Sequence, residues 1–110
     1  MLKTTATIEQ IGKEVVDFLS SSINVDMVLL FGSYAQGNFR KDSDFDMAVI
    51  SEDLVKMGIL EKMELFCKIA LAVDSRVEVK GFGKSEFLNP RKGSLLEMIK
   101  KQGKILYSRR

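Results

Sequence analysis

A continuous apolar run in the first third of the chain sets the strongest limit on its fold. Val28, Leu29, Leu30 and Phe31 follow one another without a polar residue, and Gly32 ends the run. A short run of this kind is typical of a strand that is buried on both faces. The sequence therefore predicts a buried strand over residues 28–31, followed by a turn.

Helical spacing of apolar residues predicts three helices. The first is expected over about residues 7–21, and a last helix around residues 95–99 would end at Gly103. Between them, residues 54–73 have the pattern of one long amphipathic helix. Its expected core-facing stripe consists of Ile59, Met63, Phe66, Cys67, Ala70 and Val73.

Two further strands and an edge strand complete the expected fold. A second strand is expected over residues 45–50, and in residues 76–80 charged residues alternate with valines, as in a strand with one apolar face. Residues 105–107 fit a short edge strand. We therefore expect a single mixed α+β domain over residues 1–110, with a short mixed sheet and helices packed on one face.

Composition narrows the class of protein without identifying it. The 110 residues are 45% hydrophobic and 29% charged, as in a compact globular domain, and the net charge of +2 gives no strong attraction to nucleic acid or to an anionic membrane. The one cysteine cannot form an internal disulfide, and no apolar run approaches the ~20 residues that span a bilayer. We expect a cytoplasmic protein that does not bind a membrane, and the charge balance disfavours a nucleic-acid partner without excluding one.

Gly32 and Ser33 follow the first strand and can form a phosphate-binding turn. Glycine permits a backbone conformation closed to other residues and the close approach of a ligand, while Ser33 offers a hydroxyl and a backbone N–H. If the loop or short helical turn expected over residues 33–43 begins as a helix, its free N–H groups also point at an anion. Taken alone, this pair of residues equally fits a tight turn without a ligand.

Three acidic residues have the spacing of a metal site. Asp44 and Asp46 are one residue apart, so on a strand both carboxylates project from the same face about 6–7 Å apart, while Phe45 points to the core. Glu78 completes the set if the third strand lies beside the second, where it can share a metal or accept a proton. Oxygen ligands alone favour Mg²⁺ or Mn²⁺ over zinc. Taken singly, each acid also fits a solvated surface residue.

Competing motifs each lack a required residue. A Walker A loop fails because Asn38 and Phe39 stand where lysine and serine or threonine are needed. An EF-hand loop fails because Met47 stands where glycine is needed. Ser33 cannot be the nucleophile of a serine–histidine pair, because the chain contains no histidine.

The spacing of the candidate residues resembles a known signature. Gly32-Ser33, ten intervening residues and Asp44-Phe45-Asp46 are similar to the Gly-Ser-x10-Asp-x-Asp signature of minimal nucleotidyltransferases in the DNA polymerase beta superfamily. The expected order of helices and strands resembles that family over essentially the whole chain. The resemblance implies a polymerase beta-like fold and a transferase that moves a nucleoside monophosphate, with ATP or another nucleoside triphosphate as donor.

The resemblance also implies roles for individual residues. Gly32 and Ser33 would grip the triphosphate, and Asp44, Asp46 and Glu78 would bind two Mg²⁺ ions, with Mn²⁺ as a substitute. The chain departs from the family pattern in two ways. Many relatives carry arginine where this chain has Gln36, and the third acid is commonly aspartate rather than glutamate.

Arg40 stands at a position that is often basic in relatives and is a candidate phosphate contact.

The acceptor is likewise implied by the resemblance. Stand-alone members are commonly paired with a small helical HEPN protein (higher eukaryotes and prokaryotes nucleotide-binding), and some act as antitoxins by adenylylating it. A domain of this size does not accommodate a separate acceptor-binding domain, so we expect transfer of AMP to a hydroxyl, expected to be a tyrosine, on such a partner.

Two other functions stay open at this stage. The first is a non-catalytic antitoxin module that keeps the fold and binds nucleotide or partner without transferring anything. The second is a small-molecule transferase, although relatives that modify antibiotics usually carry an additional domain for the acceptor.

Overall fold

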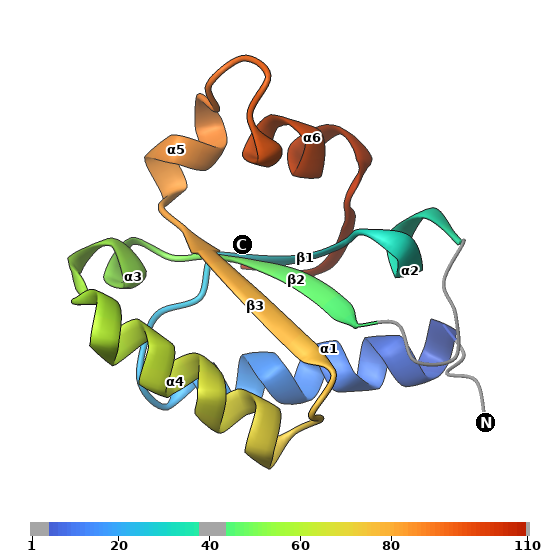
Figure 1. Ribbon diagram of the computed structural model, residues 1–110, viewed down its shortest axis with the longest axis vertical. Coiled ribbons are helices and arrows are strands. Elements are labelled where there is room, and N and C mark those ends of the chain that lie inside the picture. The colour runs from blue at the N-terminus through green and yellow to red at the C-terminus, as the bar shows by residue number, and fades with distance from the viewer. Residues whose placement is uncertain (1–4, 38–43, 110) are drawn as a thin grey trace.

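The computed structural model describes residues 5–37 and 44–109, and in these ranges four strands form one mixed sheet (Figure 1). Their order across the sheet is β3 (Val77–Phe82), β2 (Phe45–Ile50), β1 (Met27–Phe31) and β4 (Lys104–Ser108). β1 runs antiparallel to both of its neighbours, whereas β2 and β3 are parallel. The predicted strands are confirmed, and so is the mixed α+β fold class.

Helices cover both faces of this sheet. One face carries α1 (Thr5–Ser20), α3 (Glu52–Lys56) and α4 (Ile59–Ala72), and the other carries α5 (Lys84–Leu88) and α6 (Leu95–Gln102) (Figure 1). The short α2 (Ser33–Gln36) follows β1 at one end of the sheet. The expectation that helices pack on one face only is therefore wrong. None of the helices in the described ranges is long and apolar enough to cross a membrane.

The apolar run of β1 explains why both faces are covered. Val28 and Leu30 belong to a core shared with α1 and α4, while Leu29 and Phe31 belong to a second core shared with α5 and α6. All four side chains are buried. Successive residues of a strand point to opposite faces, so a wholly apolar strand needs cover on each side.

The long helix predicted over residues 54–73 is two helices. Met57 and Gly58 both have extended backbone conformations, so α3 ends at Lys56 and α4 begins at Ile59. Glycine has a low helix propensity. Met57 lies in the bend between the two helices, and its side chain packs against the first core.

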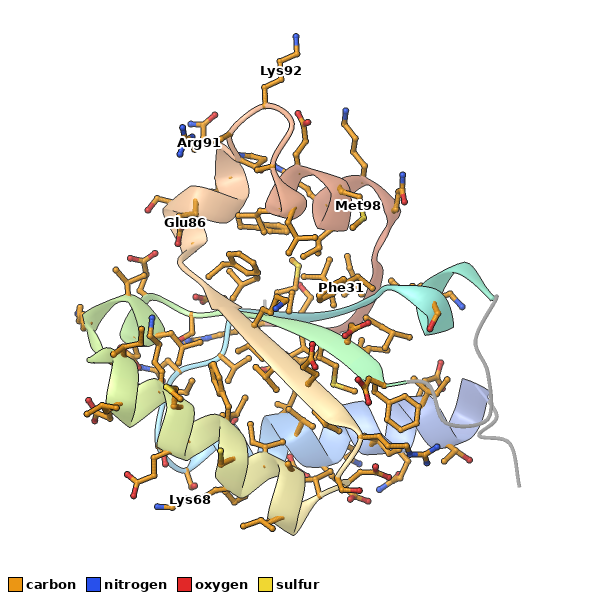
Figure 2. The ribbon with its side chains drawn as sticks, in the orientation of Figure 1. Phe31, Lys68, Glu86, Arg91, Lys92 and Met98 are labelled. Atoms are coloured by element: carbon orange, nitrogen blue, oxygen red, sulfur yellow. The ribbon has the colours of Figure 1, made fainter. Side chains whose placement is uncertain are left out.

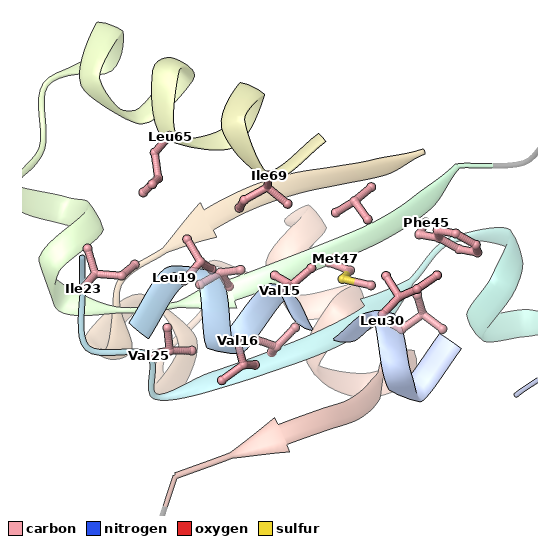
Figure 3. Packing of buried hydrophobic residues seen from close by; sticks show 14 of the residues in the cluster. Val15, Val16, Leu19, Ile23, Val25, Leu30, Phe45, Met47, Leu65 and Ile69 are labelled. Carbon is pink, nitrogen blue, oxygen red and sulfur yellow. The ribbon is translucent and has the colours of Figure 1, made fainter. Parts of the chain in front are cut away.

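The apolar stripe predicted on this segment faces the core only in part, because Phe66 and Val73 pack against the first core whereas three of its residues are exposed. The buried residues of α4 are Leu65 and Ile69, which point toward α1 and the sheet (Figure 3). Cys67, predicted to be a core residue, is exposed, and so are Ile59 and Met63. Because α4 has apolar residues on more than one side, periodicity alone does not select the side that is buried.

The last helix is confirmed, and a helix that the sequence did not indicate precedes it. α6 ends before Gly103, which forms its C-cap as predicted. α5 has only five residues, too few to show a helical period. It is held in place by Glu52 of α3, whose Oε2 accepts a hydrogen bond from the N–H of Lys84 at 2.6 Å.

Candidate active site

β2 and β3 bring two of the predicted acids together. Asp46 is the register partner of Glu78 in this parallel pair. Paired residues of neighbouring strands lie about 4.8 Å apart and project to the same face. Ala48 and Ile50 of β2 pack in the second core, so by alternation both carboxylates rise from the face that α5 and α6 cover. The expectation that the third strand lies beside the second is confirmed.

The carboxylates at this end of the sheet repel one another. Asp46 is half-buried, whereas Asp44 and Glu78 are exposed, and Asp44 directly precedes β2. Burial raises the pKa of Asp46, the negative charges of Glu78 and Asp44 raise it further, and the positive charge of Lys80 lowers it. The three acids therefore carry negative charge that Lys80 only partly offsets.

The donor atoms fit a hard divalent cation, although the ligands are not arranged around one point. Among residues 5–37 and 44–109, no group of three or more acidic, cysteine or histidine residues is positioned to hold a metal ion. Asp44, Asp46 and Glu78 offer only carboxylate oxygens, which are the ligands that Mg²⁺ and Mn²⁺ prefer. Burial is the main cause of the raised pKa of Asp46, and a bound cation would relieve the repulsion from Glu78 and Asp44 that adds to it.

Gly32 lies directly against the Asp46 carboxylate. β1 and β2 pair Phe31 with Asp46, which places the next residue, Gly32, beside that side chain. The Gly32 backbone has φ 78° and ψ −154°, a region essentially restricted to glycine. A Cβ at this position would collide with Oδ2 of Asp46. Glycine is therefore required both by the backbone turn and by the space that Asp46 fills.

The turn after Gly32 carries the other predicted phosphate contact. Ser33 is half-buried and begins α2, at the same end of the sheet as the start of β2 (Figure 1). Gly37, in a left-handed conformation, ends α2 and donates its N–H to the carbonyl of Ser33. Arg40 lies outside the described residues, and so does the side chain of Gln36, so their roles stay predictions.

The sequence does not single out two basic residues of this part of the sheet, Lys80 in β3 and Arg76 directly before it. Lys80 lies two residues beyond Glu78 in β3 and therefore projects to the same face. The guanidinium of Arg76 lies 4.8 Å from the centre of the Phe45 ring, and its carbonyl accepts a hydrogen bond from the Phe45 N–H at 2.8 Å. The alternation of charges with valines could have identified Lys80, whereas no sequence pattern indicates the contact between Arg76 and Phe45.

A comparison with protein families identifies the class of protein. The chain matches the family described as polymerase beta, nucleotidyltransferase over residues 13–110. It therefore belongs to the polymerase beta nucleotidyltransferase family. The matched range includes every candidate site residue.

A curated relative has a named activity. The protein adenylyltransferase MntA of Shewanella oneidensis is 34% identical to this chain over 67 residues, which cover 60% of this chain and 47% of the relative. This chain thus spans about half the length of the curated relative that it matches.

Two solved structures share the fold. A crystal structure of a toxin–antitoxin with AMP-PNP contains a chain with a TM-score of 0.64 and 29% identity, covering 89% of this chain and 73% of that chain. A second structure is described as a tri-AMPylated Shewanella oneidensis HEPN toxin in complex with MNT antitoxin. Its matching chain has a TM-score of 0.59 and 25% identity, covering 93% of this chain and 73% of that one.

Proposed function

We propose that this chain transfers AMP from ATP to a hydroxyl on a helical HEPN-type partner protein, and that the modified hydroxyl belongs to a tyrosine. The partner is a toxin in this proposal, and the chain acts as its antitoxin in the cytoplasm. Residues 1–110 would then make up one nucleotidyltransferase domain.

The observation that carries the proposal is the contact of Gly32 with Asp46, beside Glu78 in register on the next strand. Transfer of a nucleotide requires the triphosphate to approach metal-binding carboxylates closely. A turn without a side chain, followed by the hydroxyl and N–H of Ser33, allows that approach. This arrangement supports a donor site at the end of the sheet where β1 ends and β2 begins.

Asp44, Asp46 and Glu78 are the residues that would hold divalent cations, and we propose two Mg²⁺ ions. When bound, such ions supply positive charge at the α-phosphate and at the departing pyrophosphate. The fit rests on the charge of the site, because burial raises the pKa of Asp46 and the negative charges of Glu78 and Asp44 raise it further. The same negative charge favours a bound cation.

The reaction is a substitution at phosphorus. The acceptor oxygen forms a bond to the α-phosphorus of ATP, the bond from that phosphorus to the bridging oxygen breaks, and pyrophosphate leaves. Glu78 is exposed and can accept the proton of the hydroxyl and pass it to water. Ser33 would hold the triphosphate together with Gly32, and we assign a further phosphate contact to Arg40.

The relatives support the choice of donor and acceptor. MntA is named a protein adenylyltransferase, and the structures similar to this chain include a toxin–antitoxin with AMP-PNP and an AMPylated HEPN toxin bound to an MNT antitoxin. A non-catalytic module that only binds nucleotide or partner has less support, because the glycine turn and the acids are present together in this chain.

Pyrophosphate release separates catalysis from binding alone. With ATP, Mg²⁺ and the acceptor, Asp44→Asn or Asp46→Asn should lower the rate by roughly 10²-fold or more, since each removes a charged ligand from the site. Asp17→Asn removes the same charge from the exposed side of α1 and should keep the wild-type rate. Wild-type rates in both site variants would remove these acids from the mechanism. Calorimetric binding of ATP without any turnover would support the non-catalytic module instead.

A further inference from the structure

α4 carries an apolar surface that the fold leaves uncovered. Leu60, Met63 and Leu71 are 78%, 57% and 89% exposed, and Cys67 is exposed between them. These four residues, called the α4 stripe below, recur at intervals of three or four and so form one line along the helix. The buried side of α4 points the opposite way, toward α1 and the sheet (Figure 3). The stripe is therefore separate from the core.

The α4 stripe has the character of a contact surface. Single exposed apolar residues are common on protein surfaces, whereas a contiguous set of long apolar side chains typically marks an interaction site. Ile59, which is 72% exposed, extends the apolar surface at the start of the helix. Apolar residues at intervals of three and four on an exposed helix face are the pattern by which helices pair.

Two charged residues beside the α4 stripe indicate which partner is complementary to this surface. Glu64 and Lys68 are both exposed and lie one turn apart on the same flank of the stripe. Lys68 points away from the body of the molecule (Figure 2). If a second α4 lies antiparallel against the first, Glu64 of one copy is level with Lys68 of the other, and symmetry forms the same pair twice. In a parallel two-fold pair the same flank of the two helices lies on opposite sides of the contact, so Glu64 and Lys68 would form no pair across it.

The apolar residues match in the same antiparallel arrangement. Leu60, near the start of one helix, lies level with Leu71, near the end of the other. Met63 then lies level with Cys67 of the second copy. A two-fold axis makes each of these contacts twice, as in an isologous interface. The surface is thus complementary to itself in both charge and hydrophobicity.

We propose that two copies of this chain associate through their α4 stripes as an antiparallel helix pair. α4 packs on the first core, whereas Asp46 and Glu78 project from the face of the second core. Association through α4 therefore leaves both candidate sites open to an acceptor. This inference goes beyond the proposed transfer reaction and does not depend on it.

Sedimentation of the full chain without nucleotide tests the association. The wild-type chain should dimerise, and combining Met63→Glu with Leu71→Glu should raise the dimer Kd by at least about tenfold, because four carboxylates would be placed in the interface. The melting temperature of the monomer should stay unchanged, since both side chains are exposed. Leu88→Glu alters a leucine of α5 that is 61% exposed and is the matched control, which should dimerise as the wild type does.

Charge reversal tests the antiparallel register. Glu64→Lys places like charges across the interface and should weaken the dimer, and adding Lys68→Glu to the same chain should restore it. A wild-type chain that stays monomeric at every concentration overturns the proposal, even if it captures a helical partner through the stripe. The proposal is also overturned if the dimer Kd is unchanged by Met63→Glu with Leu71→Glu. It is overturned likewise if adding Lys68→Glu to Glu64→Lys does not restore the dimer.

Discussion

At the scale of single residues, the backbone turn at Gly32 leaves no room for a side chain beside Asp46. Gly32→Ala should lower the free energy of unfolding by about 2–3 kcal/mol, because its backbone conformation strains alanine and the new Cβ displaces the carboxylate. Gly37→Ala is the matched control. Its φ is also positive, but among the described residues a Cβ there has nothing within 4 Å, so the loss should be about 1 kcal/mol. Urea unfolding measures both, and equal losses would contradict the close contact.

Ionised Asp46 should destabilise the chain when no metal is bound. Burial and the charges of Glu78 and Asp44 raise its pKa. When the pKa of a carboxyl is higher in the folded than in the unfolded state, its protonation stabilises the folded state. Its stabilising effect is therefore complete below the unfolded pKa of about 4 and is lost as the pH rises through the folded pKa. Asp46→Asn should accordingly stabilise the metal-free chain at pH 7, because the amide carries no charge to bury or repel.

Thermal unfolding in the presence of a chelator, followed across the acidic pH range, measures this effect. Asp46→Asn should melt above the wild type at pH 7 and lose the advantage at low pH, while Asp17→Asn should show no such gain. Excess Mg²⁺ should then raise the melting temperature of the wild type more than that of Asp46→Asn. A variant no more stable than the wild type at pH 7 would contradict the combined effect of burial and the neighbouring acids on Asp46.

The candidate site residues differ in how far the sequence could predict them. Asp46 and Glu78 could be paired because alternation along a strand fixes the face to which each side chain points. Lys80 obeys the same alternation but belongs to no signature. The collision that a Cβ at Gly32 would make with Asp46 depends on the pairing of β1 with β2, which no local pattern specifies.

At the scale of elements, α4 shows the limit of periodicity. The strands were predicted to within one or two residues, because apolar runs and alternation mark them directly. The break at Met57 and Gly58 and the five-residue α5 were missed, since short helices are set by tertiary contacts such as that of Glu52 with Lys84. The predicted stripe of α4 includes Phe66 and Val73, which pack on the core, but not the more deeply buried Leu65 and Ile69, because apolar residues occupy more than one side of the helix.

Two substitutions in α4 test which side of the helix packs against the core. Ile69 is fully buried, so Ile69→Ala should lower the free energy of unfolding by about 2–4 kcal/mol. Leu71 is 89% exposed, so Leu71→Ala should change it by less than about 0.5 kcal/mol in the monomer. Denaturant titration at low protein concentration makes the comparison. Similar losses in the two variants would show that the helix is rotated relative to this structure.

At the scale of the whole molecule, the two faces of the sheet have different roles. The face of α1, α3 and α4 holds the larger core, whereas the opposite face is covered by α5 and α6 and carries the candidate acids at its free end. The sequence indicated this double cover only through the unbroken apolar run of β1. Which helices lie on which face depends on long-range packing and could not be predicted from local patterns.

The transfer reaction itself is best tested by weighing the acceptor. The chain is co-purified with its partner from native cells, supplied with ATP and Mg²⁺, and the partner is measured intact by mass spectrometry. We expect the partner to gain the mass of AMP on a tyrosine, and we expect no gain when the chain carries Asp44→Asn. A partner that stays unmodified beside a chain that binds ATP and Mg²⁺ would contradict the proposed function.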